Sequence, residues 1–478
     1  MNEYKNYDNL VLTTKIEDMT SDKINRDILR RLKENVDVYD VEVNYNSLWL
    51  SSSRSSLYYD VSDCNHYVPD KDEDLGWLGY FIGKSTCLKE LNFDTHIKSK
   101  PFYMGLSDNT TIQTMYFEGL DLLDGEIFNL MSTFFKNNHN LTEFQVVDCE
   151  LGDGCATSIS LALGGCNKSF KRISIHSLDL ENGQLSDIIL ALSMHPQLEQ
   201  INLASMNIGR NECTALATLL QCTTRGLQKL NLNHNRIDDK GLDDLIRSLV
   251  NGHQLQGLYL ASNQLITTRG WESLSTLLEV PNSNLEELVF SSNNIGDNGA
   301  LTFANALVGN SKLKNLYLHD NGITDEGWAS FSQPLCDTTS INKTYASNHT
   351  LQSLIPYFAG FSYPEVVQPL LDLNGTSEDK KQIAMKKILR HHPNIDMKPF
   401  FEWDSKGERS LKALPYVMSW FDRAEKAVAD DNGYNYNIGA KRLSTVFQFA
   451  QAMPLMFVPA SHEGSIVVRA SHGHKSIH

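Results

Sequence analysis

The sequence predicts an α/β solenoid, a horseshoe with a parallel sheet on its concave face and helices on its convex face. Three observations predict this fold. One apolar pattern begins nine times along the chain, and each unit passes from alternating apolar residues to helical spacing. A single unit of that length cannot bury its own apolar face, so neighbouring units have to stack.

The repeated pattern is clearest in the second half of the chain. The units that begin at residues 227, 285 and 313 read LQKLNLNHNRIDDKGLDDL, LEELVFSSNNIGDNGALTF and LKNLYLHDNGITDEGWASF. The same register starts at 88, 112, 141, 170, 198 and 255, so successive starts differ by 24, 29, 29, 28, 29, 28, 30 and 28 residues. This near-constant spacing predicts one array of similar units.

Each unit carries the signals of a strand followed by a helix. In the last unit, Leu316 and Leu318 alternate as the buried positions of a half-exposed strand. Asp325 then precedes Trp328, where helical spacing begins, and an aspartate there can cap the helix start. Gly327 allows a tight turn or a close approach of a neighbouring element.

The pattern resembles the leucine-rich repeats of the ribonuclease-inhibitor type, whose units of 28 and 29 residues each form a strand and a helix. The resemblance covers roughly residues 57–360 and is most specific from 198 to 335. In that family an asparagine at the ninth position of each unit forms a buried ladder that pairs with the backbone of the following turn. The resemblance assigns this structural role to Asn235, Asn263, Asn293 and Asn321.

The earlier units have other residues at the ninth position. These are Leu120, Cys149, Leu178 and Met206. They fill the volume of an asparagine but lack its amide, and an unpaired buried backbone group costs roughly 1–3 kcal/mol. We therefore expect the first half of the solenoid to be less regular than the second.

Both ends of the chain lack the repeat. The predicted domains are an N-terminal cap over 1–56, the solenoid over 57–360, and a C-terminal helical cap with a flexible tail over 361–478. Because an open solenoid end exposes its core, a cap is the expected role of the last region, and a second docking module is the alternative. Predicted helices cover 21–32, 379–392, 409–428 and 441–453, and a predicted strand covers 36–45.

The stretch DKDEDLGWLGYFIGKST at 70–86 resembles two binding motifs but completes neither. A phosphate loop needs a glycine five residues before Gly83, whereas the preceding glycine is Gly79. A calcium loop that starts at Asp70 needs glycine and glutamate where Leu75 and Phe81 stand. We predict that neither ligand binds, that a helix begins near Leu75, and that Gly83 ends this helix.

Composition and motif content exclude several classes of function. The net charge of −16 disfavours nucleic acid and anionic membranes as partners, and the eight cysteines include no CxxC pair that would indicate zinc. No catalytic signature is present, so we expect no enzymatic activity and no cofactor or metal. Without a signal organisation or an apolar run near 20 residues, we expect a cytoplasmic protein.

The concave face is the predicted binding site. Alternation directs the third, fifth and seventh positions of each unit to that face, where a strip roughly 40 Å long suits a folded protein or an extended peptide. The candidate residues are Tyr116, His176, Asn202, Asn231, Asn233, His234, Tyr259, Tyr317, His319 and Asp320. Tyrosine is frequent among the residues that anchor interfaces. We therefore predict a protein-binding scaffold or adaptor with an unidentified partner.

A second functional class stays open. Similar repeats occur in proteins that activate the Ran GTPase, so a GTPase-activating protein is the alternative. Those activators typically carry a strongly acidic tract after the repeats. The corresponding region of this chain is mixed and locally basic, as LRHHPN at 389–394 illustrates.

Overall fold

The protein was analysed as a computed structural model of the full chain. The structure describes residues 6–38, 46–52, 65–70, 73–122, 126–152, 154–165, 170–178, 180, 183–222, 226–250, 254–280, 283–355, 367–375 and 380–392. The chain divides into two compact units, Met1–Leu335 with Thr350–Gly375 and Cys336–His349 with Thr376–His478.

The first unit contains the predicted solenoid. Within the described residues its main sheet has eleven strands, all parallel, in the order β13-β12-β11-β10-β9-β8-β6-β4-β3-β1-β2. The strands are β1 (Ser47–Leu50), β2 (His66–Tyr67), β3 (Glu90–Phe93), β4 (Thr114–Glu118), β6 (Glu143–Val147), β8 (Arg172–His176), β9 (Gln200–Asn202), β10 (Lys229–Asn231), β11 (Gly257–Tyr259), β12 (Glu287–Val289) and β13 (Asn315–Tyr317). The α/β solenoid prediction is confirmed.

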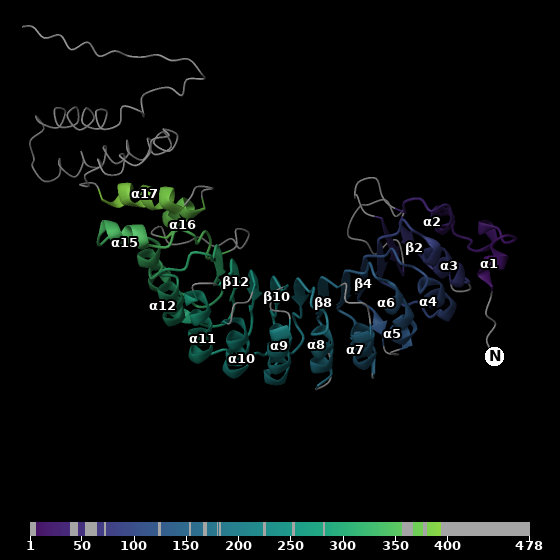
Figure 1. Ribbon diagram of the computed structural model, residues 1–478, viewed down its shortest axis with the longest axis horizontal. Coiled ribbons are helices and arrows are strands. Elements are labelled where there is room, and N and C mark those ends of the chain that lie inside the picture. The colour runs from purple at the N-terminus through teal and green to yellow at the C-terminus, as the bar shows by residue number, and fades with distance from the viewer. Residues whose placement is uncertain are drawn as a thin grey trace, which may run out of the picture. The chain divides into compact units, whose positions relative to one another are not determined.

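Helices α3 to α12 lie along one side of this sheet, and the remaining helices of the first unit belong mainly to its ends (Figure 1). The helices of the first unit are α1 (Tyr7–Leu10), η1 (Ile16–Asp18), α2 (Lys23–Glu34), α3 (Gly76–Lys84), α4 (Lys100–Leu106), α5 (Glu126–Leu130), α6 (Ser132–Asn137), α7 (Cys155–Gly165), α8 (Gln184–Leu192), α9 (Arg210–Cys222), α10 (Asp239–Val250), α11 (Thr268–Glu279), α12 (Gly296–Ala306), α13 (Asp325–Ala329), α14 (Ser332–Leu335) and α16 (Gln368–Asn374). The helix expected at 21–32 is confirmed as α2.

The core lies between the sheet and these helices. Within one repeat, Leu230 and Leu232 of the strand segment and Leu242 and Leu245 of α10 are buried. Burying such a side chain contributes roughly 1.5–3 kcal/mol relative to leaving it exposed. In the earlier repeats the same layer contains aromatic rings, and those of Phe93 and Phe117 stack with centroids 4.6 Å apart.

Helix starts in the second half also join neighbouring repeats. The Asp297 carboxylate accepts hydrogen bonds from the backbone N–H and the hydroxyl of Thr324 in the next repeat, both at 2.8 Å. Asp239 accepts the same pair from Thr267. Gly327 lies against Asp297 so closely that an added Cβ would collide with the carboxylate. The recurring Asp and Gly therefore hold successive helices together.

The N-terminal edge of the sheet extends beyond the predicted repeats. β1 pairs with β3 in the register Leu48↔Leu91, and β2 pairs with the outer side of β1. β2 thus lies further out than β1 although it follows it in the chain. The strand expected at 36–45 falls mostly outside the described residues.

The motif-like stretch at 70–86 forms a helix with a glycine-rich face. The predicted start near Leu75 is confirmed, since α3 begins at Gly76. The prediction that Gly83 ends this helix is wrong, because Gly83 is buried within α3 and Ser85 follows the helix. An added Cβ on Gly83 or Gly79 would collide with the backbone of α4, so these glycines serve close helix packing.

The C-terminal edge of the sheet is covered by residues 351–355. Leu316 N–H and Leu318 N–H donate to the carbonyls of Ser353 and Leu354, at 2.9 and 3.1 Å. Asn374 of α16 donates to the Leu351 carbonyl at 2.8 Å. The regular strands therefore end after β13 in the described residues, and the predicted domain boundaries remain predictions.

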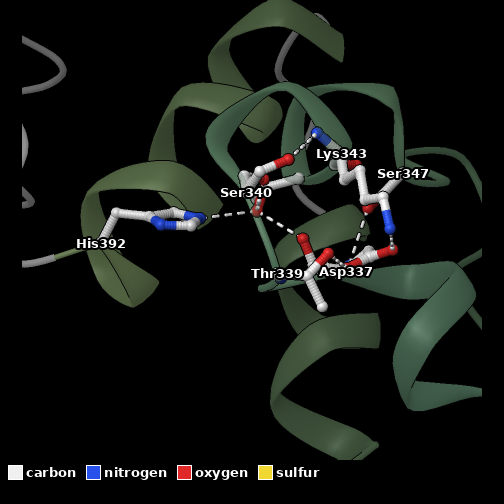
Figure 2. Close-up of polar contacts among 7 residues, drawn as sticks. Asp337, Thr339, Ser340, Lys343, Ser347 and His392 are labelled. Atoms are coloured by element: carbon white, nitrogen blue, oxygen red, sulfur yellow. Dashed lines mark hydrogen bonds and ion pairs between the residues drawn. The ribbon is translucent and has the colours of Figure 1, made fainter.

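The second unit contains α15 (Ile341–Ala346) and α17 (Lys380–His391), which confirms the helix predicted at 379–392. Figure 2 shows the polar contacts around α15, where the Thr344 hydroxyl lies 2.8 Å from His392 Nε2. Lys387 donates to the Asn348 carbonyl at 2.9 Å, and burial lowers the pKa of this lysine to about 7. The helices predicted at 409–428 and 441–453 lie outside the described residues.

Candidate protein-binding site

The candidate site is the sheet face opposite the helices. Register pairs connect the fifth positions of successive repeats into one row across the sheet, which continues onto β1 and β2. The row is His66, Trp49, Asn92, Tyr116, Gln145, Ser174, Asn202, Asn231, Tyr259, Val289 and Tyr317. Neighbouring strands lie about 4.8 Å apart, so the row forms a long strip of side chains.

Trp49 and His66 were not among the residues predicted from the sequence. The repeat spacing did not reach them, because Leu48 and its register partner Leu91 are 43 positions apart in the chain. The alternation of Leu48, Trp49 and Leu50 was the available signal, since it matches the strand pattern of every repeat.

Tyr259 and Tyr317 are in register through Val289, two strands apart. The Tyr259 hydroxyl donates to Glu287 Oε2 at 2.6 Å, and its ring lies over Gly257, where an added Cβ would approach it to 3.0 Å. Burial and the Glu287 carboxylate raise the pKa of Tyr259. The two tyrosines are half-buried.

His319, His234 and Asp320 lie at the end of the strands. His319 Nδ1 is 2.9 Å from the Ser291 hydroxyl on the neighbouring strand. His234 and Asp320 are exposed and have left-handed backbone, with φ of 56° and 55°. This conformation favours glycine, and histidine, asparagine and aspartate are the other residues that adopt it most readily.

Left-handed backbone recurs at the eighth position of every repeat from the second onward. The residues are Gly119, Asp148, Ser177, Ser205, His234, Ser262, Ser292 and Asp320. The turn after each strand therefore has one geometry, whatever residue occupies it.

The three predicted asparagines in the middle of the face contact the sheet itself. Asn202 Nδ2 donates to the Ser174 hydroxyl at 3.0 Å, and Asn231 Oδ1 accepts from the Asn233 N–H at 3.0 Å. Asn233 Oδ1 in turn accepts from the Ala261 N–H at 2.7 Å. Asn202 and Asn233 therefore link neighbouring repeats, Asn231 bonds within its own repeat, and part of the hydrogen-bonding capacity of all three amides is already used.

Tyr116 and His176 lie toward the N-terminal end of the face. The Tyr116 hydroxyl hydrogen-bonds with Glu118, and burial is the main cause that raises its pKa. Burial lowers the pKa of His176, although Asp148 and Glu118 act in the opposite direction. The Tyr116 ring meets Trp49 edge to face, with centroids 6.2 Å apart and planes at 84°.

The four ladder asparagines are buried behind the strand ends. Asn235 Oδ1 accepts from the backbone N–H groups of Met206 and Ile208 in the preceding repeat, at 2.9 and 3.0 Å. Its Nδ2 donates to the carbonyls of Leu203 and Leu232, both at 3.0 Å.

The other ladder members repeat this geometry. Asn263, Asn293 and Asn321 each donate from Nδ2 to a carbonyl of the preceding repeat at 3.0, 2.9 and 2.9 Å. Each amide therefore joins two repeats through backbone groups that would otherwise be buried without a partner.

A second buried polar column was missed by the sequence analysis. Asn109 Nδ2 donates to the Ile82 carbonyl at 2.7 Å, Asn138 Nδ2 to the Ile112 carbonyl at 3.1 Å, and Asn310 Nδ2 to the Leu278 carbonyl at 2.7 Å. At the same position His195 Nε2 lies 2.9 Å from the Leu163 carbonyl. The signal was present as an asparagine three residues before the first apolar residue of several repeats.

In the part of the chain that the structure describes, no helix is both long and apolar enough to cross a membrane.

Comparison with known proteins identifies the repeats. A family model described as Leucine Rich repeat matches residues 226–245, 282–304 and 309–332. The ribonuclease inhibitor of Sus scrofa is 32% identical over 149 residues, which is 30% of this chain and 32% of that protein. The NACHT, LRR and PYD domains-containing protein 14 of Mus musculus is 25% identical over 200 residues, which is 41% of this chain and 19% of that protein. The chain thus spans about a third and about a fifth of these relatives.

Solved structures show weaker likeness. The Rad7 and Elc1 complex of yeast has a chain that is 14% identical, with 74% of this chain and 88% of that chain covered and a TM-score of 0.43. An internalin of Listeria monocytogenes is 18% identical, with 63% and 73% covered and a TM-score of 0.37. Since both scores are below 0.5, the fold assignment rests on the strands and register of this chain.

Proposed function

We propose that this chain, a leucine-rich-repeat protein of the ribonuclease-inhibitor type, is a non-enzymatic scaffold or adaptor that binds a partner protein or extended peptide on its concave sheet face. One observation carries the proposal. Helices line one side of the parallel sheet (Figure 1). Half-buried aromatic and polar residues stand in register along the strands. Such a long strip is better matched to a polypeptide than to a small metabolite.

Two regions of the face supply aromatic anchors. Tyr259 and Tyr317 lie near the C-terminal end of the sheet, and Trp49 and Tyr116 lie near the N-terminal end. Large aromatic residues carry much of the energy at protein interfaces, and polar neighbours orient the partner. Hydrogen bonds already hold the Asn202 and Asn233 amides between them to the sheet, so little ordering of these side chains is required on binding.

The experiment compares variants of the two faces of the first unit. The double variant Tyr259→Ala, Tyr317→Ala removes the anchors near the C-terminal end. The matched control, Leu161→Ala with Leu301→Ala, removes exposed apolar side chains from the convex helices α7 and α12. Affinity capture from native lysate, followed by mass spectrometry and measurement of Kd with the captured protein, should show at least roughly tenfold weaker binding for the tyrosine variant, about 1.4 kcal/mol.

The convex control should bind the partner as the wild type does, and both variants should keep the wild-type circular dichroism spectrum. Loss of binding in the convex control with unchanged binding in the tyrosine variant would place the partner on the helices and contradict the proposal.

The GTPase-activating alternative remains a prediction without a specific observation in its favour. A GTP-hydrolysis assay with Ran, with and without this protein, separates it from the scaffold function. Stimulated hydrolysis would favour the alternative.

A further inference from the structure

We propose that the N-terminal part of the concave face binds a basic segment of the partner, with one arginine or lysine side chain held against the rings of Trp49 and Tyr116 and the carboxylates of Asp94 and Glu118. These four residues are called the aromatic–acidic site below. The inference rests on the proposed function and specifies the chemistry of the partner.

The aromatic half of the site is formed by three adjacent strands. Trp49 of β1 and Tyr116 of β4 are both register partners of Asn92 in β3, which lies between them. Asn92 is only 1% exposed, as expected if the two rings meet over it. One ring of Trp49 also stacks on His66 at 5.6 Å and 16°. The remaining ring surface of the half-buried Trp49 and Tyr116 can receive a cation.

The acidic half lies one step along the same strands. Phe93 and Phe117 are register partners, so Asp94 and Glu118, which follow them, are neighbours across two strands. In the described structure Asp94 accepts hydrogen bonds from the Ser52 N–H at 3.0 Å and from Ser51, and nearby His66 acts to lower its pKa. Burial raises the pKa of Asp94, which means that a nearby cation would stabilise its ionised form.

Some acidic residues elsewhere on the first unit have cationic partners. Glu143 pairs with Arg172 through Nε at 2.7 Å, and Glu286 pairs with Lys314 at 2.7 Å. Among the described residues no lysine or arginine forms an ion pair with Asp94 or Glu118. The segments 94–97 and 118–122, which follow β3 and β4, contain no lysine or arginine. Within the described residues, neither carboxylate of the site is thus paired with a lysine or arginine.

Charge and shape favour a basic occupant. The chain has 42 basic and 58 acidic residues, a net charge of −16, which attracts a positively charged segment over a distance. A guanidinium group can stack on an aromatic ring and donate to two carboxylate oxygens at once. An arginine thus satisfies both halves of the aromatic–acidic site, whereas an acidic or purely apolar segment satisfies at most one.

The test uses the full chain and a defined probe. The probe is a fluorescein-labelled peptide of three Gly-Arg-Ala-Arg repeats, and its control replaces every arginine with citrulline, which keeps the shape but removes the charge. Fluorescence anisotropy at moderate ionic strength should give a Kd for the arginine peptide that is at least roughly tenfold lower than for the citrulline peptide. Equal affinities, or no measurable binding of the arginine peptide, would overturn the inference.

Two site variants and one control locate the binding. Glu118→Gln and Trp49→Ala should each weaken the arginine peptide at least roughly fivefold, while Glu326→Gln, an equal charge change at an exposed residue of α13, should leave it unchanged. If Glu326→Gln weakens binding as much as Glu118→Gln, the attraction is general and the aromatic–acidic site is wrong. Glu118→Gln is close to isosteric at an exposed position, so it reports on charge even if Trp49→Ala disturbs folding.

The two proposals fail in different ways. A natural partner that loses affinity for the Tyr259→Ala, Tyr317→Ala variant but binds Glu118→Gln and Trp49→Ala like the wild type would overturn the aromatic–acidic site. That result would leave the proposed scaffold function in place.

Discussion

From β9 to β13 each strand has three residues and the turn behind it is held by a buried asparagine, whereas β4, β6 and β8 have five residues each and no asparagine at that position. In the earlier half a small parallel sheet of β5 (Asp121–Leu122) and β7 (Glu150–Leu151) takes over part of the pairing. The Glu150 N–H donates to the Leu120 carbonyl at 2.8 Å, and the Gly119 N–H donates to the Val147 carbonyl at 3.0 Å.

The two halves therefore provide hydrogen-bond partners for the same turn backbone groups in different ways. Where an amide side chain is present, it replaces backbone partners and the strand stays short. Where Leu120 or Cys149 is present, the backbone pairs with the next repeat and the strand becomes longer; the Cys149 thiol adds a contact of 3.3 Å to the Val147 carbonyl. The first half therefore differs from the second, as expected. The difference is additional backbone pairing between repeats, and not backbone groups left without a partner.

The largest loss of stability is expected when one ladder amide is removed. Asn263→Ala should lower the free energy of unfolding by about 3 kcal/mol, because the Ile237 N–H and the Leu232 carbonyl lose buried partners at 3.2 and 3.0 Å. Urea denaturation measures the change. The control is Asn298→Ala, at an exposed residue of α12, which should change stability by less than about 0.5 kcal/mol. Equal losses at both sites would mean that the ladder contributes nothing specific.

A second prediction inserts an asparagine into each half. Leu120→Asn should cost roughly 2 kcal/mol, because β5–β7 pairing already uses the turn backbone and the new amide is buried with few partners. Met206→Asn should cost less than about 1 kcal/mol, because Met206 adjoins the ladder through its bond to Asn235. Thermal unfolding of the two variants gives the comparison. A smaller loss for Leu120→Asn would contradict the distinction between the halves.

The left-handed position allows a reciprocal exchange between the halves. Gly119→Ser should destabilise the protein by about 1 kcal/mol, since a Cβ has open space at this position but the φ of 63° disfavours a side chain. Ser262→Gly should change stability by less than about 1 kcal/mol, because relief at φ 56° is offset by the greater freedom of glycine when unfolded. Chemical denaturation of both variants tests the pair, and a stabilising Gly119→Ser would refute the shared turn geometry.

The smallest expected effect concerns the carboxylate links between helices of the second half. The hydrogen bonds from Thr324 lower the pKa of Asp297 below its ordinary value of 3.8, so its contribution to stability is present above that value and is lost as the pH falls through the lowered pKa. The stability difference between wild type and Asp297→Asn should therefore shrink below pH 3.8. Unfolding curves across this range provide the measurement, with Thr324→Val as a second way to remove the hydroxyl bond. A difference that is constant with pH would show that the link has no ionic part.

The sequence was sufficient for the features that depend on periodicity. Regular spacing located the main-sheet strands from β3 to β13, although not β5 and β7, and an asparagine at a fixed position located the ladder. The sequence was insufficient for predicting contacts between elements that are distant in the chain. Gly83 was interpreted from its neighbours alone, although α4 determines its role, and Trp49 lies outside the repeat spacing. Alternation predicts which residues share a column on the face. It does not predict which of these side chains bond to the sheet itself, as Asn233 does.

The direction of the ladder has a consequence for folding during synthesis. Asn235 accepts from Met206 and Ile208, so the turn of one repeat is completed by a residue made 29 and 27 positions later. At about 5–20 residues per second the ribosome needs roughly 1.5–6 s to add that stretch. Throughout that interval the backbone N–H groups of the newest turn in the second half have no asparagine partner. A nascent chain stalled within a repeat would therefore expose one incomplete turn at its growing end. The turns of the β4 and β6 repeats close mainly through backbone pairing, to which the Cys149 thiol adds one contact.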